Sequence, residues 1–407
     1  MSLYESLKMA LAAIWANRLR SILTLFGVIV GVTSVITIIS ALEGLMGSIE
    51  DSLSALGPAT FIVTKFGIIT SEEDYFKALK RKDLSIRDMD AVAEGCPDCL
   101  EVSGRTYSRS SIKRGNQGLR RVPIGGSPAN FIDVIDFEVA EGRYFTQAEY
   151  EHKNQVAFVG PTIVEELCDG VDPIGRTIKI KGRKFTIVGV AKKRGSMLGN
   201  NQDNFAFIPL TTHIKLFGKP RHNFNLAIKS NTIEGIEDTM DQARVILRAR
   251  RGVDYKEEDD FDILTAENIL GFVENTTRMV RVALVGISSI ALVVGGIVIM
   301  NIMMVSVTER TREIGIRKSI GARRKNVLTQ FLFEALILSM GGGMIGTALG
   351  IVIAIILGGQ ISLPVEPSLF AISAGLSIST GVGVFFGLYP AVKASNMNPI
   401  EALRFET

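Results

Sequence analysis

Cysteine, histidine and tryptophan are all scarce in this sequence, which has three, three and one of them among 407 residues. Three cysteines are too few for a fold that is held together by disulfides. The histidines, His152, His213 and His222, lie far apart along the chain, which argues against a histidine metal site. The formal net charge is only +3, so the basic excess of a nucleic-acid-binding protein is also missing, and we expect no nucleic acid as a partner.

Catalytic motifs are missing as well. The sequence contains no H-E-x-x-H zinc motif, no G-x-S-x-G nucleophile elbow and no phosphate-binding G-x-x-x-x-G-K-[ST] loop. We therefore predict no catalytic, cofactor-binding or metal-ligating residues, and no hydrolysis of ATP by the usual phosphate-loop chemistry on this chain.

Charge is absent from four long stretches, although charged residues make up 21% of the whole chain. A helix needs about 20 apolar residues to span the hydrocarbon core of a bilayer. The four stretches reach that length without Asp, Glu, Lys, Arg or His, and they are 21–42, 282–307, a run within 335–365, and 367–392. They predict four transmembrane helices, and the remaining charge predicts a soluble domain between the first two.

A cleaved signal peptide is the alternative for the first stretch. The apolar run is followed by Glu43-Gly44-Leu45-Met46, without the A-x-A pattern of a cleavage site. We therefore interpret this stretch as a membrane anchor.

Residues 1–20 ahead of it predict an amphipathic helix in the cytoplasmic interface, with Trp15 near the lipid headgroups. The alternative is a plain lead-in to the first span.

Basic residues set the expected direction of the spans, because Lys and Arg in short loops remain on the cytoplasmic side. Segment 308–334 carries seven basic residues, whereas the short loop 358–366 carries none. This asymmetry places both termini in the cytoplasm and residues 43–277 outside it. We expect a multi-pass protein of the cytoplasmic (inner) membrane.

The predicted fold class is therefore membrane α-helical, with four transmembrane helices, plus an extracytoplasmic α+β domain of two lobes. In chain order the predicted segments are a cytoplasmic lead-in helix (1–20), helix 1 (21–42), the extracytoplasmic core domain (43–277), helix 2 (278–307), a cytoplasmic coupling helix and lead into helix 3 (308–334), helix 3 (335–357), a short outer loop (358–366), helix 4 (367–392) and a cytoplasmic tail (393–407).

Short apolar runs and turn residues predict the elements of the extracytoplasmic domain. Alternating runs joined at Lys181-Gly182 predict a hairpin over 176–190, and a serine at the helix start predicts a helix over 85–94. Two further strands, 224–228 and 261–264, flank a polar amphipathic helix over 233–250, which together predict a β-α-β unit. Additional strands are expected at 60–65 and 155–159.

All three cysteines fall in this domain. The pair Cys96 and Cys99 follows a predicted helix, whereas a thioredoxin-type pair opens one, so a catalytic redox role is disfavoured. Two interpretations remain open. One is a disulfide, either local or longer in range with Cys168, and the other is a set of buried thiols.

Glycines recur at four-residue spacing in the predicted spans. Gly27 and Gly31 form such a pattern in the first span, and Gly342, Gly346 and Gly350 extend it through the third. Small residues at this spacing let helix backbones approach closely. The pattern indicates helix packing, either within one chain or between two copies, and the first span is a candidate for the dimer contact.

The cytoplasmic segment after the second span has charges of both signs. Glu309, Arg310, Glu313, Arg317 and Lys318 predict a charged helical face, with Ile314 and Ile320 as apolar contacts and Gly321 ending the helix. A short mixed-charge helix joined to a span can dock on a soluble partner. The alternative is a topological anchor, for which the acidic residues would not be needed.

Several runs resemble the macrolide-exporter-like (MacB/FtsX-type) ABC transporter permeases. They are NRLRSILTLFGVIVGV, EGRYFT, QVAFVG, DPIGRTIKIKGRKFTIVGV, ERTREIGIRKSIGARRKNVLTQFLFEA and GLYPAVKASNMNPIEALRFE, in the family's order. The resemblance implies a homodimer that works with two ATPase domains and transmits their motion to the outer domains. It assigns Glu309, Arg310, Glu313, Ile314, Arg317, Lys318 and Gly321 to the region that contacts the ATPase.

The resulting expectation is a permease subunit with a separate cytoplasmic ATPase. ATP and magnesium would be bound by that partner and no cofactor by this chain. The substrate classes that relatives handle are drugs, peptides, lipids and lipoproteins, and a periplasmic adaptor (membrane fusion protein) is a further candidate partner. The alternatives are a non-transport regulator of an extracytoplasmic enzyme such as a cell-wall hydrolase, and a membrane-anchored enzyme.

Overall fold

The computed structural model describes residues 18–54, 56–57, 59–135, 137–168, 170–197, 200–220, 223–365 and 368–403. The chain divides into two compact units. The membrane unit comprises residues up to 47 and from 274 onward, and the outer domain comprises residues 48–273. The outer domain therefore begins and ends a few residues inside the predicted range of 43–277. Most of the predicted lead-in helix lies outside the described residues.

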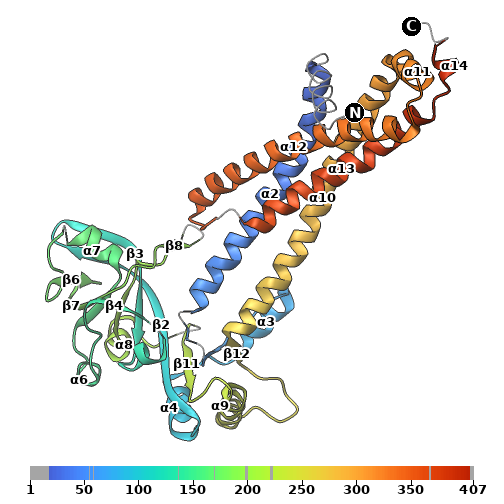
Figure 1. Ribbon diagram of the computed structural model, residues 1–407. Coiled ribbons are helices and arrows are strands. Elements are labelled where there is room, and N and C mark those ends of the chain that lie inside the picture. The colour runs from blue at the N-terminus through green and yellow to red at the C-terminus, as the bar shows by residue number, and fades with distance from the viewer. Residues whose placement is uncertain are drawn as a thin grey trace. The chain divides into compact units, whose positions relative to one another are not determined.

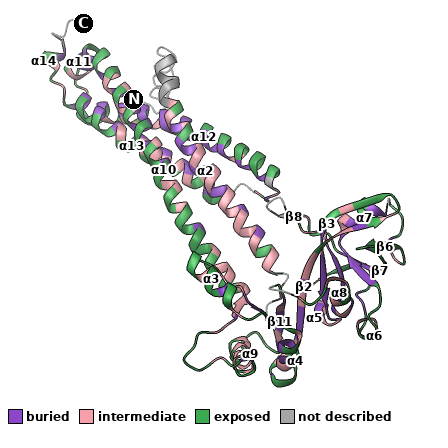
Figure 2. Ribbon diagram, turned by 180° about the vertical axis from the view of Figure 1, so that it is seen from behind, coloured by how far each residue is buried: buried purple, intermediate pink, exposed green. Residues whose placement is uncertain are grey.

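Four long helices form the membrane unit, as the charge-free stretches predict (Figure 1). They are α2 (Arg18–Ser54), α10 (Ala266–Glu309), α12 (Arg324–Ile361) and α13 (Leu369–Asn396). All four are long and apolar enough to cross a membrane. The helix α2 continues beyond residue 42, where the first span was predicted to end. The helix α10 begins before residue 278, where the second span was predicted to begin. Large apolar side chains such as Phe26 and Phe385 are exposed, which suits contact with lipid. Figure 2 shows exposed residues along α10, α12 and α13.

Small residues let these helices pack closely within one chain. A β-carbon on Gly27 would lie 2.8 Å from the Cα of Gly295 in α10. One on Gly346 of α12 would lie 2.9 Å from the carbonyl oxygen of Ile29 in α2. The hydroxyl of Thr33 also donates a 3.0 Å hydrogen bond to the carbonyl of Gly346. The spans are therefore held together by backbone approach that larger side chains would prevent.

Of the two interpretations of the glycine pattern, packing within one chain and packing between two copies, these contacts agree with the first for Gly27 and Gly31. Gly27 faces α10, and a β-carbon on Gly31 would lie 2.7 Å from the side chain of Leu292. Gly342 and Gly350 face α2 in the same way. The glycine pattern could not distinguish packing within a chain from packing between chains, because both need the same small residues.

The outer domain is α+β, as predicted. Its strands are β1 (Thr60–Thr64), β2 (Cys99–Arg114), β3 (Gln117–Ser127), β4 (Val139–Gly142), β5 (Val156–Val159), β6 (Thr177–Ile180), β7 (Arg183–Ala191), β8 (Ser196–Met197), β9 (Asn200–Asn201), β10 (Ala206–Pro209), β11 (Asn225–Ser230) and β12 (Asp262–Thr265). Its helices are α3 (Glu72–Lys80), α4 (Ile86–Gly95), α5 (Phe131–Val134), α6 (Gln147–Glu151), α7 (Pro161–Leu167), α8 (Leu210–Phe217) and α9 (Ile236–Arg251).

The first lobe is built on strands β12, β1, β11 and the beginning of β2. Strands β11 and β12 both pair antiparallel with β1, so they run parallel to each other with β1 between them. The predicted β-α-β unit is thus confirmed, with α9 as the crossover. The helices α4 and α9 bury Val92 and Leu247 against Phe61 in one hydrophobic core.

The second lobe is a small closed barrel. Its strands pair in the circuit β2, β3, β10, β5, β7, β6 and back to β2. Alternate residues of each strand point into the barrel, including Ile112, Ile178 and Phe185, which are fully buried. The predicted hairpin at Lys181-Gly182 is confirmed, and both turn residues adopt positive φ. Strand β2 belongs to both lobes and joins them.

Candidate functional site

The helix α11 (Thr311–Ser319), which follows α10, is the candidate coupling site (Figure 1). The preceding helix α10 ends at Glu309, and Arg310 lies between the two helices. Gly321 has φ of +103°, a conformation that a residue with a β-carbon rarely adopts, so the helix ends there and α12 begins at Arg324. The predicted stop at Gly321 is confirmed.

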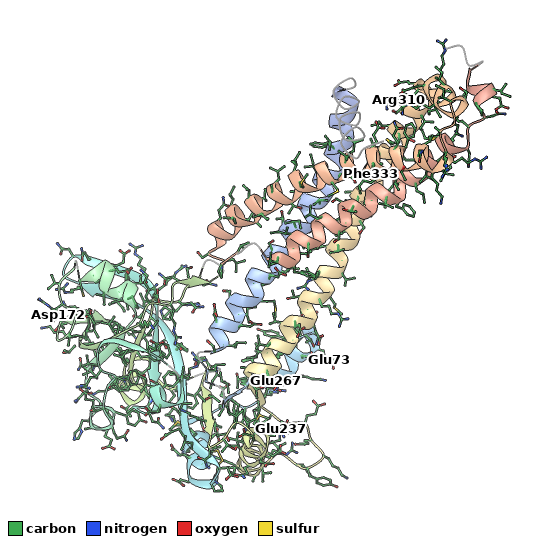
Figure 3. All side chains as sticks on the ribbon, in the orientation of Figure 1. Glu73, Asp172, Glu237, Glu267, Arg310 and Phe333 are labelled. Atoms are coloured by element: carbon green, nitrogen blue, oxygen red, sulfur yellow. A yellow bond between two sulfur atoms is a disulfide. The ribbon has the colours of Figure 1, made fainter. Side chains whose placement is uncertain are left out.

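Polar contacts fix α11 to the neighbouring helices of the membrane unit. The ammonium group of Lys318 donates to the carbonyls of Ser395 and Met397 at the end of α13, the latter at 2.7 Å. Arg317 donates to the side chain of Gln330 in α12 at 2.8 Å. Arg310, which immediately precedes α11 (Figure 3), forms an ion pair of 3.6 Å with Glu334 of α12.

Apolar burial reinforces these contacts. Ile314 is only 4% exposed and belongs to the same hydrophobic core as Val307 of α10 and Phe331 of α12. The expectation that Ile314 offers an apolar contact to a partner is therefore wrong, because the side chain is used within the chain. The helix α11 is therefore packed against α10, α12 and α13.

One face of this region remains exposed. Its residues recur at helical spacing across the end of α10 and along α11, and they are Glu309, Arg312, Glu313, Ile316 and Ile320. The side chains of Ile316 and Ile320 are 43% and 82% exposed. Ile316 was not identified from the sequence, although its spacing of four residues from Arg312 and from Ile320 would have placed it on this face.

The charged residues of α11 differ between the side that packs against the membrane unit, here called inner, and the exposed side, here called outer. Partial burial, followed by the positive charge of Arg324, lowers the pKa of Lys318, whose protons are donated to backbone carbonyls. On the outer side Glu313 pairs with Arg317, while Arg312 is exposed. Two exposed apolar side chains, Ile316 and Ile320, therefore lie among charges of both signs on this face.

The cysteines of the outer domain form a local bridge. Cys96 and Cys99 are joined by a disulfide directly after α4, with their Cα atoms 5.4 Å apart. Cys168 lies buried in the barrel core, so the longer-range bridge is not formed. The pair follows its helix, as expected, and does not have the helix-opening position of a reactive pair.

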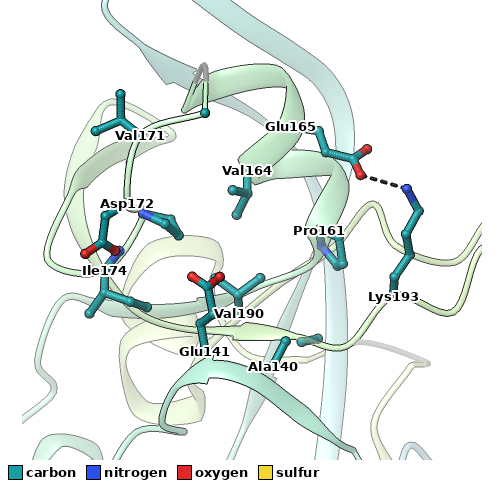
Figure 4. Close-up of a pocket in the computed structure, with 13 residues that line it drawn as sticks. Ala140, Glu141, Pro161, Val164, Glu165, Val171, Asp172, Ile174, Val190 and Lys193 are labelled. Atoms are coloured by element: carbon teal, nitrogen blue, oxygen red, sulfur yellow. Dashed lines mark hydrogen bonds and ion pairs between the residues drawn. The ribbon is translucent and has the colours of Figure 1, made fainter.

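A cavity of about 750 Å³ lies between α7, β4 and β7 of the barrel lobe (Figure 4). At its rim, Lys193 and Glu165 form an exposed ion pair of 2.7 Å. Asp172 accepts a hydrogen bond of 2.9 Å from the backbone of Ile174, which stabilises the loop. Among the residues that the structure describes, no group of three His, Cys, Asp or Glu side chains could hold a metal ion here or elsewhere.

Two family models match this chain. The MacB-like periplasmic core domain matches residues 21–257, and the FtsX-like permease C-terminal region matches residues 285–399. The first match covers the first span and most of the outer domain. The second covers most of α10, all of α11 and α12, and α13.

Individual relatives agree with these matches. The macrolide export ATP-binding/permease protein MacB of Syntrophobacter fumaroxidans is 31% identical over 99% of this chain, which spans 64% of that protein. The uncharacterized ABC transporter permease YknZ of Bacillus subtilis is 31% identical, with 100% of both chains covered. The crystal structure of the periplasmic region of MacB from Actinobacillus actinomycetemcomitans matches 56% of this chain at 18% identity, with a TM-score of 0.45.

Proposed function

Because this chain belongs to the MacB-like and FtsX-like ABC transporter permease family, we propose that it couples a separate cytoplasmic ATPase to its own outer domain. The end-to-end match with the permease YknZ supports a permease that works with an ATPase on another chain. That partner would bind ATP and magnesium. Two copies of this chain, with both termini in the cytoplasm of the inner membrane, would form the working unit.

The contacts of α11 are the observation that carries this proposal. The helix is bonded to α12 and α13 through Arg317 and Lys318, and Ile314 is buried against the helices around it. It also exposes Ile316 and Ile320. A partner that holds the exposed face and changes shape when it binds ATP would move three spans together. We infer that such motion reaches the outer domain and acts there on the substrate, which is a drug, peptide, lipid or lipoprotein.

The test is to change the exposed face without disturbing the contacts within the chain. Reversing Glu313 would also break its ion pair with Arg317, so the isoleucines are the better targets. We expect the double variant Ile316→Asp and Ile320→Asp to insert normally, because acidic residues contribute little to topology. It should no longer co-purify with the ABC ATPase that accompanies the unchanged protein, since the apolar contacts would be replaced by desolvated charge.

The matched control is Asn326→Asp with Thr329→Asp, which adds the same two charges to exposed positions at the start of α12. The control should retain the ATPase and its rate of ATP hydrolysis. If the isoleucine variant inserts, retains the ATPase and supports hydrolysis at the normal rate, then α11 is a topological anchor and the proposed coupling is wrong.

A further inference from the structure

Two segments of the outer domain have many basic residues and no acidic ones. Residues 102–132 contain six Lys or Arg and residues 173–202 contain eight, whereas the whole chain has 42 acidic residues. The first segment forms most of the β2–β3 hairpin, and the second forms β6, β7 and the short strands after them. Because β6 pairs with both β2 and β7, the fold brings these separate segments together.

The strand register aligns three lysines across the barrel wall. Lys113 of β2 is opposite Lys179 of β6, and Lys179 is opposite Lys184 of β7. Residues directly opposite one another share a face of the sheet. All three lysines are exposed, and their neighbours Ile112 and Ile180 are buried inside the barrel. We call Lys113, Lys179 and Lys184 the basic ladder.

This arrangement works against stability. Like charges directly opposite each other on neighbouring strands are destabilising. The ion pairs formed by the nearby lysines of the second segment join Lys192 to Glu138 and Lys193 to Glu165. Among the residues that the structure describes, no ion pair involves the basic ladder. A feature that weakens the fold without compensation within the chain indicates a binding role.

The surface around the ladder distinguishes between two kinds of partner. Protein interfaces depend on buried apolar or aromatic anchors. Within the described parts of 101–127 and 173–191 there is no exposed large hydrophobic side chain. Further exposed charge on β2 and β3 comes instead from Arg109, Arg120 and Arg121. The surface is therefore suited to a ligand that is held by charge alone.

We propose that the basic ladder binds a polyanion with closely spaced phosphate groups, the chemistry of phosphorylated surface glycans. Neighbouring strands lie about 4.8 Å apart, so two flexible lysine side chains can reach oxygens of the same phosphate. Successive phosphates can then follow the row from β2 to β7. The ligand would hold the outer domain against an anionic polymer, a role separate from the coupling proposed for α11.

Inorganic polyphosphate of defined length is the probe, titrated against the full chain in a nonionic detergent. We expect binding that weakens steeply with added salt, because counterions are released on binding. The triple variant Lys113→Gln, Lys179→Gln and Lys184→Gln should bind at least about tenfold more weakly and show a smaller salt dependence. Its melting temperature should be unchanged or higher, because the repulsion between the lysines is removed.

The control variant Lys77→Gln, Lys80→Gln and Lys215→Gln removes the same charge from exposed positions on α3 and α8. It should bind polyphosphate like the unchanged protein. Equal weakening in both triple variants would show nonspecific attraction and overturn the proposal. Tighter binding of polyglutamate would indicate an acidic protein partner, and tighter binding of phosphatidylglycerol vesicles would indicate a lipid surface. Either result would also overturn it.

Discussion

His213 of the outer domain shows how burial changes a single residue. This residue belongs to α8 and its side chain is buried. The centroid of its ring lies 4.7 Å from that of the Phe217 ring. The histidine fits only because residue 126 is glycine: a β-carbon on Gly126 would lie 2.5 Å from the β-carbon of His213. Burial disfavours the charged imidazolium and lowers the pKa of His213 to about 4, from 6.5 in the unfolded chain.

This shift predicts a pH dependence of stability. Between pH 6.5 and 4 the unfolded chain binds a proton that the folded chain does not, so acid favours unfolding. The contribution is fully present above pH 6.5 and is lost as the pH falls toward 4. We expect thermal unfolding to show a larger fall in stability between pH 7 and 4.5 for the unchanged protein than for His213→Phe. An equal fall in both would mean that the histidine is not responsible.

The disulfide between Cys96 and Cys99 predicts the behaviour of the thiols. Labelling the unfolded protein without reductant should modify one thiol, that of Cys168, and labelling after reduction should modify all three. The loop closed by this bridge is short, so replacing both bridged cysteines by serine should cost no more than about 2 kcal/mol. Three reactive thiols before reduction, in protein taken from its native membrane, would contradict the assignment.

At the scale of elements, helix contacts through glycine set the structure of the membrane unit. The face of α2 that carries Gly27 lies against Gly295 of α10. We expect Gly27→Ile to push the two backbones apart and to destabilise the single chain by about 1–3 kcal/mol, the usual cost of overpacking. The measurement is thermal unfolding in detergent, with insertion checked in the membrane fraction.

A matched variant is Gly286→Ile, also in a helix of the membrane unit, where a β-carbon would meet nothing within 4 Å of it. This change should leave the melting temperature almost unaltered. If Gly27→Ile instead weakened cross-linking between copies and left the stability of each copy unchanged, the earlier expectation of a dimer contact at Gly27 would be supported.

At the scale of the whole molecule, the prediction concerns topology. The test uses reporter fusions, each of which shows on which side of the membrane its position lies. The three positions are the exposed hairpin tip Gly115, the site after Ala322 and the C-terminus. We expect the first reporter outside the cytoplasm and the other two inside it, because segment 308–334 is rich in basic residues. All three reporters on the same side would be incompatible with the four-span arrangement.

The sequence was sufficient for features that depend on neighbouring residues. Runs without charge determined the four spans, because an ion in the hydrocarbon core is costly. The positive φ at Gly321 and the hairpin at Lys181-Gly182 followed from local backbone preferences. The β-α-β unit and several separate strands of the outer domain were predicted for the same reason, and so was the position of α11.

Only the tertiary structure decided which faces of these elements are used within the chain. It buried Ile314, left Ile316 exposed and placed Gly27 against α10, although the sequence pattern allowed other arrangements. It also closed the barrel, which aligned Lys113 with Lys179 and Lys184. The physical reason is that side-chain periodicity specifies a face but not its partner, because contacts between distant segments depend on how all the elements pack together.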